Sequence, residues 1–214
     1  MKKLSSLILF AALAIGCGED TTDKTARTPD PAPVTGTEQL AANAAAKLIE
    51  QFSHSLKNEL MAAIKAGGPE NAIEMCQSRA PEITLSYSQH DWTIKRVSEK
   101  NRNPVHAANE GELAMLARFT DTTDEVPPFI DEWIETETGR AYRYYKPIRT
   151  GTLCLKCHGQ PEKISNAVTQ VLADKYPRDK ATGYGPGELR GMFVVQTKWP
   201  EGKPFADSLV KADR

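Results

Sequence analysis

The chain of 214 residues has almost no net charge and few cysteines. Lys and Arg total 27 against 28 Asp and Glu, so the formal net charge is −1. A chain without a large net positive charge lacks the positive electrostatic field on which nucleic-acid binding depends. Four cysteines are too few to hold a domain of this length together by disulfides. With 40% hydrophobic and 26% charged residues, we expect a folded globular protein that does not bind nucleic acid.

The sequence also lacks an apolar run long enough to span a bilayer as a permanent helix. Its longest apolar run, residues 7–15, follows Lys2 and Lys3 and precedes Cys17. A short apolar segment behind a basic start is typical of an export signal. The sequence therefore predicts a signal peptide over residues 1–16.

Two cleavage sites compete at the end of this segment. Residues 14–17 (AIGC) resemble a bacterial lipoprotein signal, which predicts that Cys17 is lipidated and anchors the protein to a membrane, with the outer membrane favoured. Residues 12–14 (ALA) suit ordinary signal peptidase and would give a soluble periplasmic protein. Residues 17–36 are rich in Pro and Thr, as expected of a flexible tether, and favour the lipid anchor.

Residues 37–214 are expected to fold as one domain that begins with helices. Apolar residues recur at helical spacing from Thr37 to the Gly67-Gly68 pair, which predicts a long amphipathic helix. Pro69 suits the first turn of a second helix, and we expect Pro81 to interrupt it. The same periodicity predicts further helices over residues 112–119 and about 161–175.

Strands are predicted mainly in the later part of the chain. Residues 92–97 show the alternation and β-branching of a strand. Residues 133–136 and 141–145 flank a turn signal at residues 137–140, which predicts a hairpin. Residues 189–197 are typical of a buried strand. The fold class expected is therefore α/β of the α+β type, with helices early and an antiparallel sheet late.

Cys154, Cys157 and His158 form a C-x-x-C-H segment, the attachment signature of c-type haem. Two thiols three residues apart on a helical turn reach both vinyl groups of one porphyrin, and the adjacent imidazole ligates the iron as proximal ligand. A zinc site would need two further clustered ligands, and a thioredoxin-like pair would need a βαβ unit. The sequence pattern offers neither, so it predicts one covalently bound haem c.

Cys76 remains after the lipid anchor and the haem have used the other cysteines. Residue statistics favour a buried core thiol, while a ligand on the distal side of the iron and an intermolecular disulfide stay open. Arg96 and Arg102 are candidates to pair with the haem propionates. The other possible distal ligands are His54, His90, His106, Met75, Met115 and Met192.

Several segments, in the expected order, resemble a bacterial family of exported c-type haem domains that was formerly catalogued as a domain of unknown function. The segments are residues 72–76 (AIEMC) with 80–81, 95–98 (KRVS), 102–104 (RNP), 145–147 (YKP), 154–159 (CLKCHG), 181–184 (ATGY) and 189–191 (LRG). Members of this family occur alone or ahead of signalling modules such as histidine kinases. The resemblance implies a PAS-like fold over about residues 45–197.

The same resemblance implies that Cys76 is the distal axial ligand opposite His158, and it places Tyr145 in the haem pocket. The chain departs from the family pattern after residue 104. His106 stands where the pattern has Asn, and Ala108 stands where it has Pro. His106 is therefore an alternative ligand.

These observations favour a membrane-anchored periplasmic monohaem cytochrome in redox sensing or low-potential electron transfer, with a redox or signalling protein as partner. An iron ligated on both sides leaves no position for a substrate, which argues against an enzyme. The alternative is a small peroxidase-like enzyme or a gas-binding haem protein with an open distal site, where His90 or His106 could act as acid or base. A four-helix cytochrome is disfavoured because a strand-like run follows His158.

Overall fold

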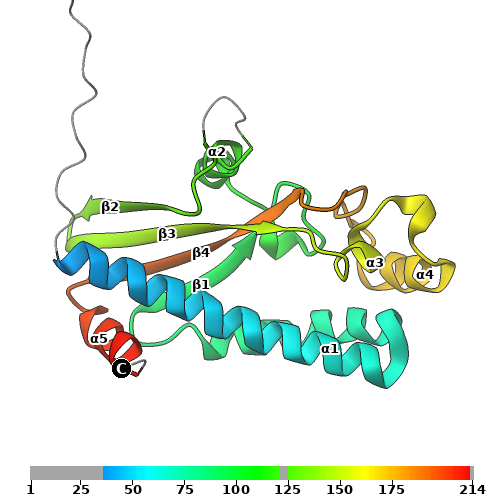
Figure 1. Cartoon of the computed structure of the whole chain (residues 1–214), viewed down its shortest axis with the longest axis horizontal. Coiled ribbons are helices and arrows are strands. Elements are labelled where there is room, and N and C mark those ends of the chain that lie inside the picture. Colours follow the sequence, from blue (N-terminus) through cyan, green and yellow to red (C-terminus); the bar gives the residue numbers. More distant parts are fainter. Residues whose placement is uncertain (1–35, 121–124, 213–214) are drawn as a thin grey trace, which may run out of the picture. The chain divides into compact units, whose positions relative to one another are not determined.

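A four-stranded antiparallel sheet and a long bent helix organise the protein in a computed structural model that describes residues 36–120 and 125–212 (Figure 1). The sheet has the order β1-β4-β3-β2. Its strands are β1 (Trp92–Val97), β2 (Ile130–Thr136), β3 (Gly139–Arg149) and β4 (Leu189–Trp199). The predicted signal peptide, Cys17, which is predicted to be lipidated, and nearly all of the predicted tether lie outside the described residues.

The helices, together with the antiparallel sheet, confirm the predicted mixed fold class. They are α1 (Gly36–Ser86), α2 (Glu110–Arg118), α3 (Leu155–His158), α4 (Asn166–Lys175) and α5 (Lys203–Lys211), with short 3-10 turns η1 (Pro104–His106) and η2 (Pro161–Lys163). None of the helices within residues 36–120 and 125–212 has the length and apolar character needed to cross a membrane.

The first part of α1 covers one face of the sheet. Ala41, Ala44 and Ala45 are fully buried in one core cluster with residues of the strands and of α5. Leu48 and Phe52 continue the same stripe, and the Phe52 ring meets the ring of Phe193 on β4 edge-on at a centroid distance of 6.0 Å. This alanine-rich part of α1 therefore packs in the core shared by the sheet and α5.

Gly67 and Gly68 bend α1 into two segments, as the sequence predicts. Gly68 has a φ of 78°, a left-handed value that favours glycine, and Pro69 begins the second segment. The second segment folds back beside the first (Figure 1), and the Tyr87 hydroxyl that follows it lies 2.7 Å from the hydroxyl of Ser55. The bend brings the second segment to the end of the sheet.

The expected interruption at Pro81 is wrong. The second segment of α1 continues through Pro81 to Ser86. A proline inside a helix removes one main-chain hydrogen bond. Ala80 and Ile83, on either side of this proline, are buried against the rest of the domain, and this packing keeps the helix in place.

Both faces of the sheet are covered, and α1 and α2 lie on opposite sides of it (Figure 1). The face toward α1 carries Trp92, Ile94, Tyr142, Tyr144 and Val195. The face toward α2 carries Val97, Tyr145, Met192 and Val194, which pack with Leu116 and Phe119. The predicted hairpin is confirmed, with Thr136 opposite Gly139. Side chains alternate between the two faces along each strand, as pleated strands require.

Two helical expectations in the last third need correction. The helix predicted over residues 161–175 is a 3-10 turn followed by α4, because Ser165 caps a new helix and its hydroxyl accepts a hydrogen bond from the main-chain N–H of Val168. The structure also contains α5, which the sequence did not predict. Its buried Ala206 and Leu209 pack against α1.

Phe52 is the side chain whose truncation tests the packing of α1 on the sheet. Phe52→Ala is expected to lower the free energy of unfolding by about 3–5 kcal/mol, because the change leaves a cavity among fully buried neighbours. Urea denaturation of the variant and the wild type measures this loss. Leu85→Ala serves as control, because 73% of Leu85 is exposed and its truncation is expected to cost less than about 0.5 kcal/mol. Similar losses in both variants would contradict the packing described.

Candidate functional site

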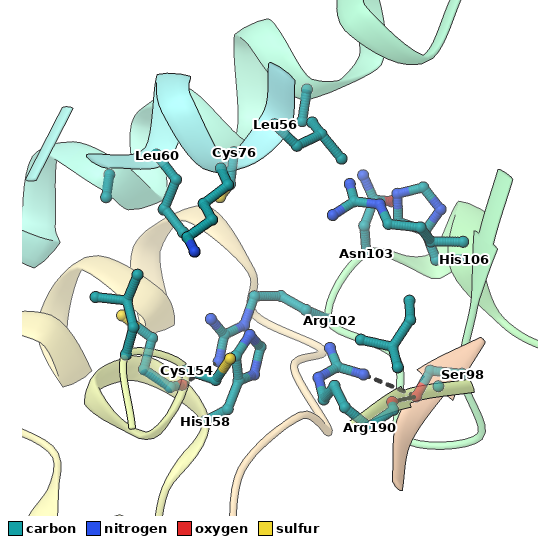
Figure 2. Close-up of a pocket in the computed structure, with 18 of the residues that line it drawn as sticks. Leu56, Leu60, Cys76, Ser98, Arg102, Asn103, His106, Cys154, His158 and Arg190 are labelled. Carbon is teal, nitrogen blue, oxygen red and sulfur yellow. Dashed lines mark hydrogen bonds between the residues drawn. The ribbon is translucent and has the colours of Figure 1, made fainter. Parts of the chain in front are cut away.

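A cavity of about 570 Å³ lies at the end of the sheet, between α1 and the segment that carries α3 (Figure 2). The face of the sheet that α1 covers reaches this cavity through Phe193 and Gly191 of β4. The chemically active residues in its lining are Cys76, Arg96, Arg102, His106, Cys154, Cys157, His158, Tyr176 and Arg190. The structure thus brings together residues from four distant parts of the chain.

The C-x-x-C-H segment forms a single helical turn. The main-chain N–H groups of Cys157 and His158 donate to the carbonyl of Cys154 at 3.2 and 2.9 Å. Gly159 ends the turn, and a Cβ at this position would lie only 2.5 Å from the carbonyl oxygen of Leu155, so glycine is required. One turn places both thiols and the imidazole toward the same cavity (Figure 2).

His158 is held as a neutral imidazole. Its Nδ1–H donates to the carbonyl of Ala181 at 2.6 Å, which leaves the Nε2 lone pair available for a metal. Burial lowers the pKa of His158 well below its usual value, and the positive charges of Arg102 and Arg190 lower it further. This hydrogen bond fixes both the tautomer and the ring orientation that a metal ligand needs.

Arg102 holds this segment to the rest of the fold. Its Nη2 donates to the carbonyl of Cys157 at 2.5 Å and to that of Ala181 at 3.4 Å, and its Nε donates to Asp179 at 2.9 Å. Asp179 in turn accepts from the main-chain N–H of Ala181 at 2.8 Å. Both charged side chains are almost completely buried. Because Ala181 also accepts from His158, the Arg102–Asp179 pair positions the imidazole.

Cys76 reaches the cavity from the second segment of α1, across from the C-x-x-C-H turn (Figure 2). Its accessible surface faces the cavity, so the expectation of a core thiol is wrong. The surrounding protein raises the pKa of Cys76 by burial, and the charges of Arg96 and Arg102 partly offset this increase. The thiol therefore meets a cavity that contains guanidinium groups and an imidazole.

Arg96, Arg102 and Arg190 make one end of the cavity strongly basic. Within the described residues, the buried Nε atoms of Arg96 and Arg190 have no hydrogen-bond partner. Arg190 donates from Nη1 to the Ser98 hydroxyl at 2.8 Å. In the described part of the chain, Asp179 supplies a neighbouring negative charge through its pair with Arg102. Buried guanidinium nitrogens without a hydrogen-bond partner fit an anionic ligand group in the cavity.

Arg190 is a site residue that the sequence analysis missed. Pairing between β3 and β4 passes from Ile148–Gly191 to Arg149–Leu189, so Arg190 has no partner on β3. A bulge of this kind redirects a side chain. Tyr176, which also lines the cavity, was missed as well. Residues 189–191 belong to the segments that carry the family resemblance. The role of Arg190 depends on the bulge, and a bulge is set by the pairing register of two strands, which no local sequence pattern reveals.

His106 also lines the cavity, on η1 (Figure 2). Burial lowers the pKa of His106 to about 4, and the charges of Arg96 and Arg190 contribute to this decrease. A hydrogen bond with the main chain of Arg96 acts in the opposite direction. The side chain is thus neutral at pH 7, on the wall beside the arginine cluster.

The other predicted site residues lie elsewhere, except for Met75, which is buried in the cavity wall. Tyr145 is buried on the α2 face of the sheet, and its hydroxyl donates to Glu132 at 2.7 Å, so it does not line the cavity. His54 is exposed on α1, and His90 lies 5.1 Å from the ring of Phe205. Met115 and Met192 pack with the core under α2.

The cavity suits a metal-containing cofactor that itself supplies most of the ligands to its metal. Among residues 36–120 and 125–212, no three His, Cys, Asp or Glu side chains cluster as a metal site. The C-x-x-C turn lies between the antiparallel strands β3 and β4, which is not a βαβ arrangement. One imidazole and one thiol on different walls suit a planar macrocycle that occupies four positions around iron.

The fold and the cavity together define an α+β domain in which two thiols and an imidazole from one turn face a thiol on a helix. The sequence model of the Tll0287-like family matches residues 32–197, so the chain belongs to this family. In fold the chain is similar to the cyanobacterial haem protein Tll0287, with a TM-score of 0.50 and 24% identity over 77% of this chain and 98% of that one. No curated protein matches the chain.

Removing the Arg102 guanidinium tests its structural role. Arg102→Ala is expected to cost about 3–5 kcal/mol of unfolding free energy, because it leaves the buried Asp179 carboxylate without its partner. Arg178→Ala is the matched control, since this neighbouring arginine is exposed. Urea denaturation compares the two variants. Equal stability of both variants would show that the buried pair does not hold the site.

Proposed function

We propose that this protein is a monohaem c-type cytochrome that acts in redox sensing or low-potential electron transfer. Cys154 and Cys157 attach the haem covalently, His158 ligates the iron, and Cys76 is the ligand on the other side. The observation that carries the proposal is the placement of these four residues on facing walls of one cavity with an arginine cluster at its end. The haem protein Tll0287, similar in fold, supports it.

The charges of the cavity fit haem. Arg96, Arg102 and Arg190 contribute three positive charges, and Asp179 neutralises one of them. Two propionates would balance the remaining two and would accept hydrogen bonds from the unpartnered Nε atoms of Arg96 and Arg190. When bound, the haem supplies a one-electron iron couple. A thiolate ligand favours the ferric state, which explains the proposed low potential.

Ligation of the iron by both His158 and Cys76 would argue against catalysis at the iron, because no position would stay free for a substrate. His106 gives one specific reason to keep a second candidate function, a small peroxidase-like or gas-binding haem protein. It lines the cavity, is half-buried and, with a pKa of about 4, is a neutral base at pH 7. This candidate requires that Cys76 leaves the distal position open.

We include in the same proposal that the protein is exported and anchored to a membrane and that its fold is PAS-like. Covalent haem attachment is supported by the export signal expected over residues 1–16, and lipidation of Cys17 would hold the domain at a membrane. The alternative is a soluble periplasmic protein. A PAS-like fold is supported by the antiparallel sheet with α1 across one face. A redox or signalling protein would then receive the electron or the redox signal from the haem.

Covalent attachment is tested by variants of the two thiols. Protein produced with a c-type maturation system is expected to keep its haem on a denaturing gel, since thioether bonds survive unfolding. The double variant Cys154→Ser/Cys157→Ser is expected to lose all gel-bound haem, while Cys76→Ser keeps it. Haem staining and mass spectrometry measure both. Haem retained by the double variant would contradict the proposed attachment.

The arginine cluster is tested by its effect on the reduction potential. Arg190→Gln is expected to lower the midpoint potential, because a nearby positive charge destabilises the ferric form, which carries the higher charge. The electrostatic change is about 1–2 kcal/mol for charges about 10 Å apart at an effective dielectric constant of about 20. Potentiometric titration measures it, with Arg178→Gln as an exposed control. An unchanged potential in Arg190→Gln would place the propionates away from Arg190.

A further inference from the structure

A second cavity, of about 340 Å³, lies beside α2 at the end of the sheet where β1 ends and β4 begins. Ser98, Arg190 and Gly191 line both this cavity and the larger one described above. The two strands approach each other closely here, because a Cβ on Gly191 would overlap the carbonyl oxygen of Val97. The ends of β1 and β4 therefore form a shared wall between the two cavities.

Apolar side chains of α2 and of the start of β4 make up much of the lining of the second cavity. They are Leu113, Leu116, Ala117 and Leu189. Leu116 is buried in the core under α2, whereas 39% of Leu113 is exposed. An exposed leucine in a cavity lining loses contact with water when an apolar group enters, which favours binding of that group. This part of the lining suits an apolar portion of a ligand.

The second cavity also carries charges of both signs. Glu99 supplies a carboxylate, and Lys100 and Arg190 supply an ammonium and a guanidinium group. Glu99 has no ion-pair partner in the described part of the chain. The buried Nε of Arg190 has no hydrogen-bond partner there either. Groups of both signs beside an apolar surface match a small molecule that has an ammonium group, a carboxylate and an apolar body.

This combination of groups selects against simpler ligands. A carboxylic acid without an ammonium group would meet the carboxylate of Glu99 without compensation, and an amine without a carboxylate would meet Lys100 and Arg190 in the same way. A volume of about 340 Å³ is at the small end of the range for ligand cavities, so the ligand is a single small molecule. A free α-amino acid with an apolar side chain satisfies these conditions.

Tyr184 connects the second cavity to the proximal side of the proposed haem site. It lines the second cavity, and its ring meets the ring of His158 in a T-shaped arrangement at a centroid distance of 6.5 Å. Its main-chain N–H donates to the carbonyl of His158 at 3.0 Å. The Nζ of Lys100 lies 4.3 Å from the centroid of the Tyr184 ring and donates to the carbonyl of Thr182 at 2.5 Å. A ligand bound to Lys100 therefore acts on residues 181–184, the segment that fixes the imidazole.

Arg190 gives a second connection, because it lines both cavities. Its guanidinium lies 5.4 Å from the centroid of the Tyr184 ring and donates to the carbonyl of Lys100 at 3.2 Å. A ligand carboxylate beside this guanidinium offsets part of the positive charge next to the larger cavity. Glu99 lines the second cavity only, so the ligand's ammonium group is farther from the larger cavity than its carboxylate.

We propose that the second cavity binds a free α-amino acid with an apolar side chain, and that this binding lowers the reduction potential of the haem. Glu99 binds the ammonium group, and Lys100 and Arg190 bind the carboxylate. Leu113 and Leu189 contact the apolar side chain. The effect on the haem rests on the proposed function, whereas the binding of the amino acid does not. The potential decreases because a carboxylate at Arg190 stabilises the ferric form, which carries the higher charge.

Isothermal titration calorimetry of the matured, haem-loaded protein tests the binding, with L-valine, L-leucine, L-methionine and L-phenylalanine as probes. At least one of them is expected to bind saturably. The same acid without its amino group, 4-methylpentanoate in the case of leucine, is expected to bind about tenfold more weakly or worse, because Glu99 then lacks a partner. The absence of saturable binding by all four probes, or equal binding of the acid without the amino group, would overturn the proposal.

Glu99→Gln is expected to weaken binding of the amino acid by about tenfold, because the ammonium group loses a charged partner. Leu113→Gln is expected to weaken it by about threefold or more through the lost apolar contact. Both side chains are exposed, so the variants are expected to fold. Glu201→Gln is the matched control, an exposed glutamate beyond the far end of β4, and is expected to change the dissociation constant by less than about twofold. Equal weakening by Glu99→Gln and Glu201→Gln would contradict the assigned site.

Potentiometric titration with and without a saturating concentration of the bound amino acid tests the effect on the haem. The midpoint potential is expected to decrease, and the dissociation constant is expected to be lower for the ferric than for the ferrous protein by the corresponding factor. A tenfold difference corresponds to about 59 mV for one electron. Saturable binding with an unchanged potential would overturn the proposed effect. Haem content is measured first by absorption, because protein without haem contradicts the proposed function instead.

Discussion

The buried guanidinium of Arg102 is the constraint on which the site depends. It joins the carbonyl of Cys157 to the carbonyl of Ala181 and the carboxylate of Asp179, so the C-x-x-C-H turn and the segment 179–181 meet at one side chain. The carbonyl of Ala181 also receives the Nδ1–H of His158. A short helical turn cannot hold its own orientation, because its terminal groups lack partners within the helix. The fixed orientation of the imidazole therefore comes from outside the turn.

Two irregularities of the backbone bring the opposite walls of the cavity into place. The bend at Gly67 and Gly68 returns the second segment of α1 to the end of the sheet, where Cys76 faces the cavity. The bulge between β3 and β4 leaves Arg190 unpaired in the sheet, next to the same cavity. Apart from the bend and the bulge, α1 and the strands have regular geometry. The site forms because the bend and the bulge place side chains of these elements at the same cavity.

Local patterns in the sequence were sufficient for the strands, the hairpin, the bend in α1 and the C-x-x-C-H turn. Pro81 misled the prediction because tertiary packing of Ala80 and Ile83 outweighs a lost hydrogen bond. Tyr145 was placed in the site by resemblance alone, whereas strand alternation points it to the α2 face. Arg102 was expected near the propionates, and its partners Asp179, Cys157 and Ala181 lie 55 to 79 residues away, which no local pattern reveals.

Spectroscopy most directly tests the proposal that Cys76 and His158 both ligate the haem iron. The ferric optical and EPR spectra of the matured protein are compared with those of Cys76→Ala. Ligation by Cys76 predicts a low-spin thiolate spectrum in the wild type and its loss in the variant. A high-spin wild-type spectrum that the substitution leaves unchanged would contradict ligation by Cys76 and show that the distal position is open.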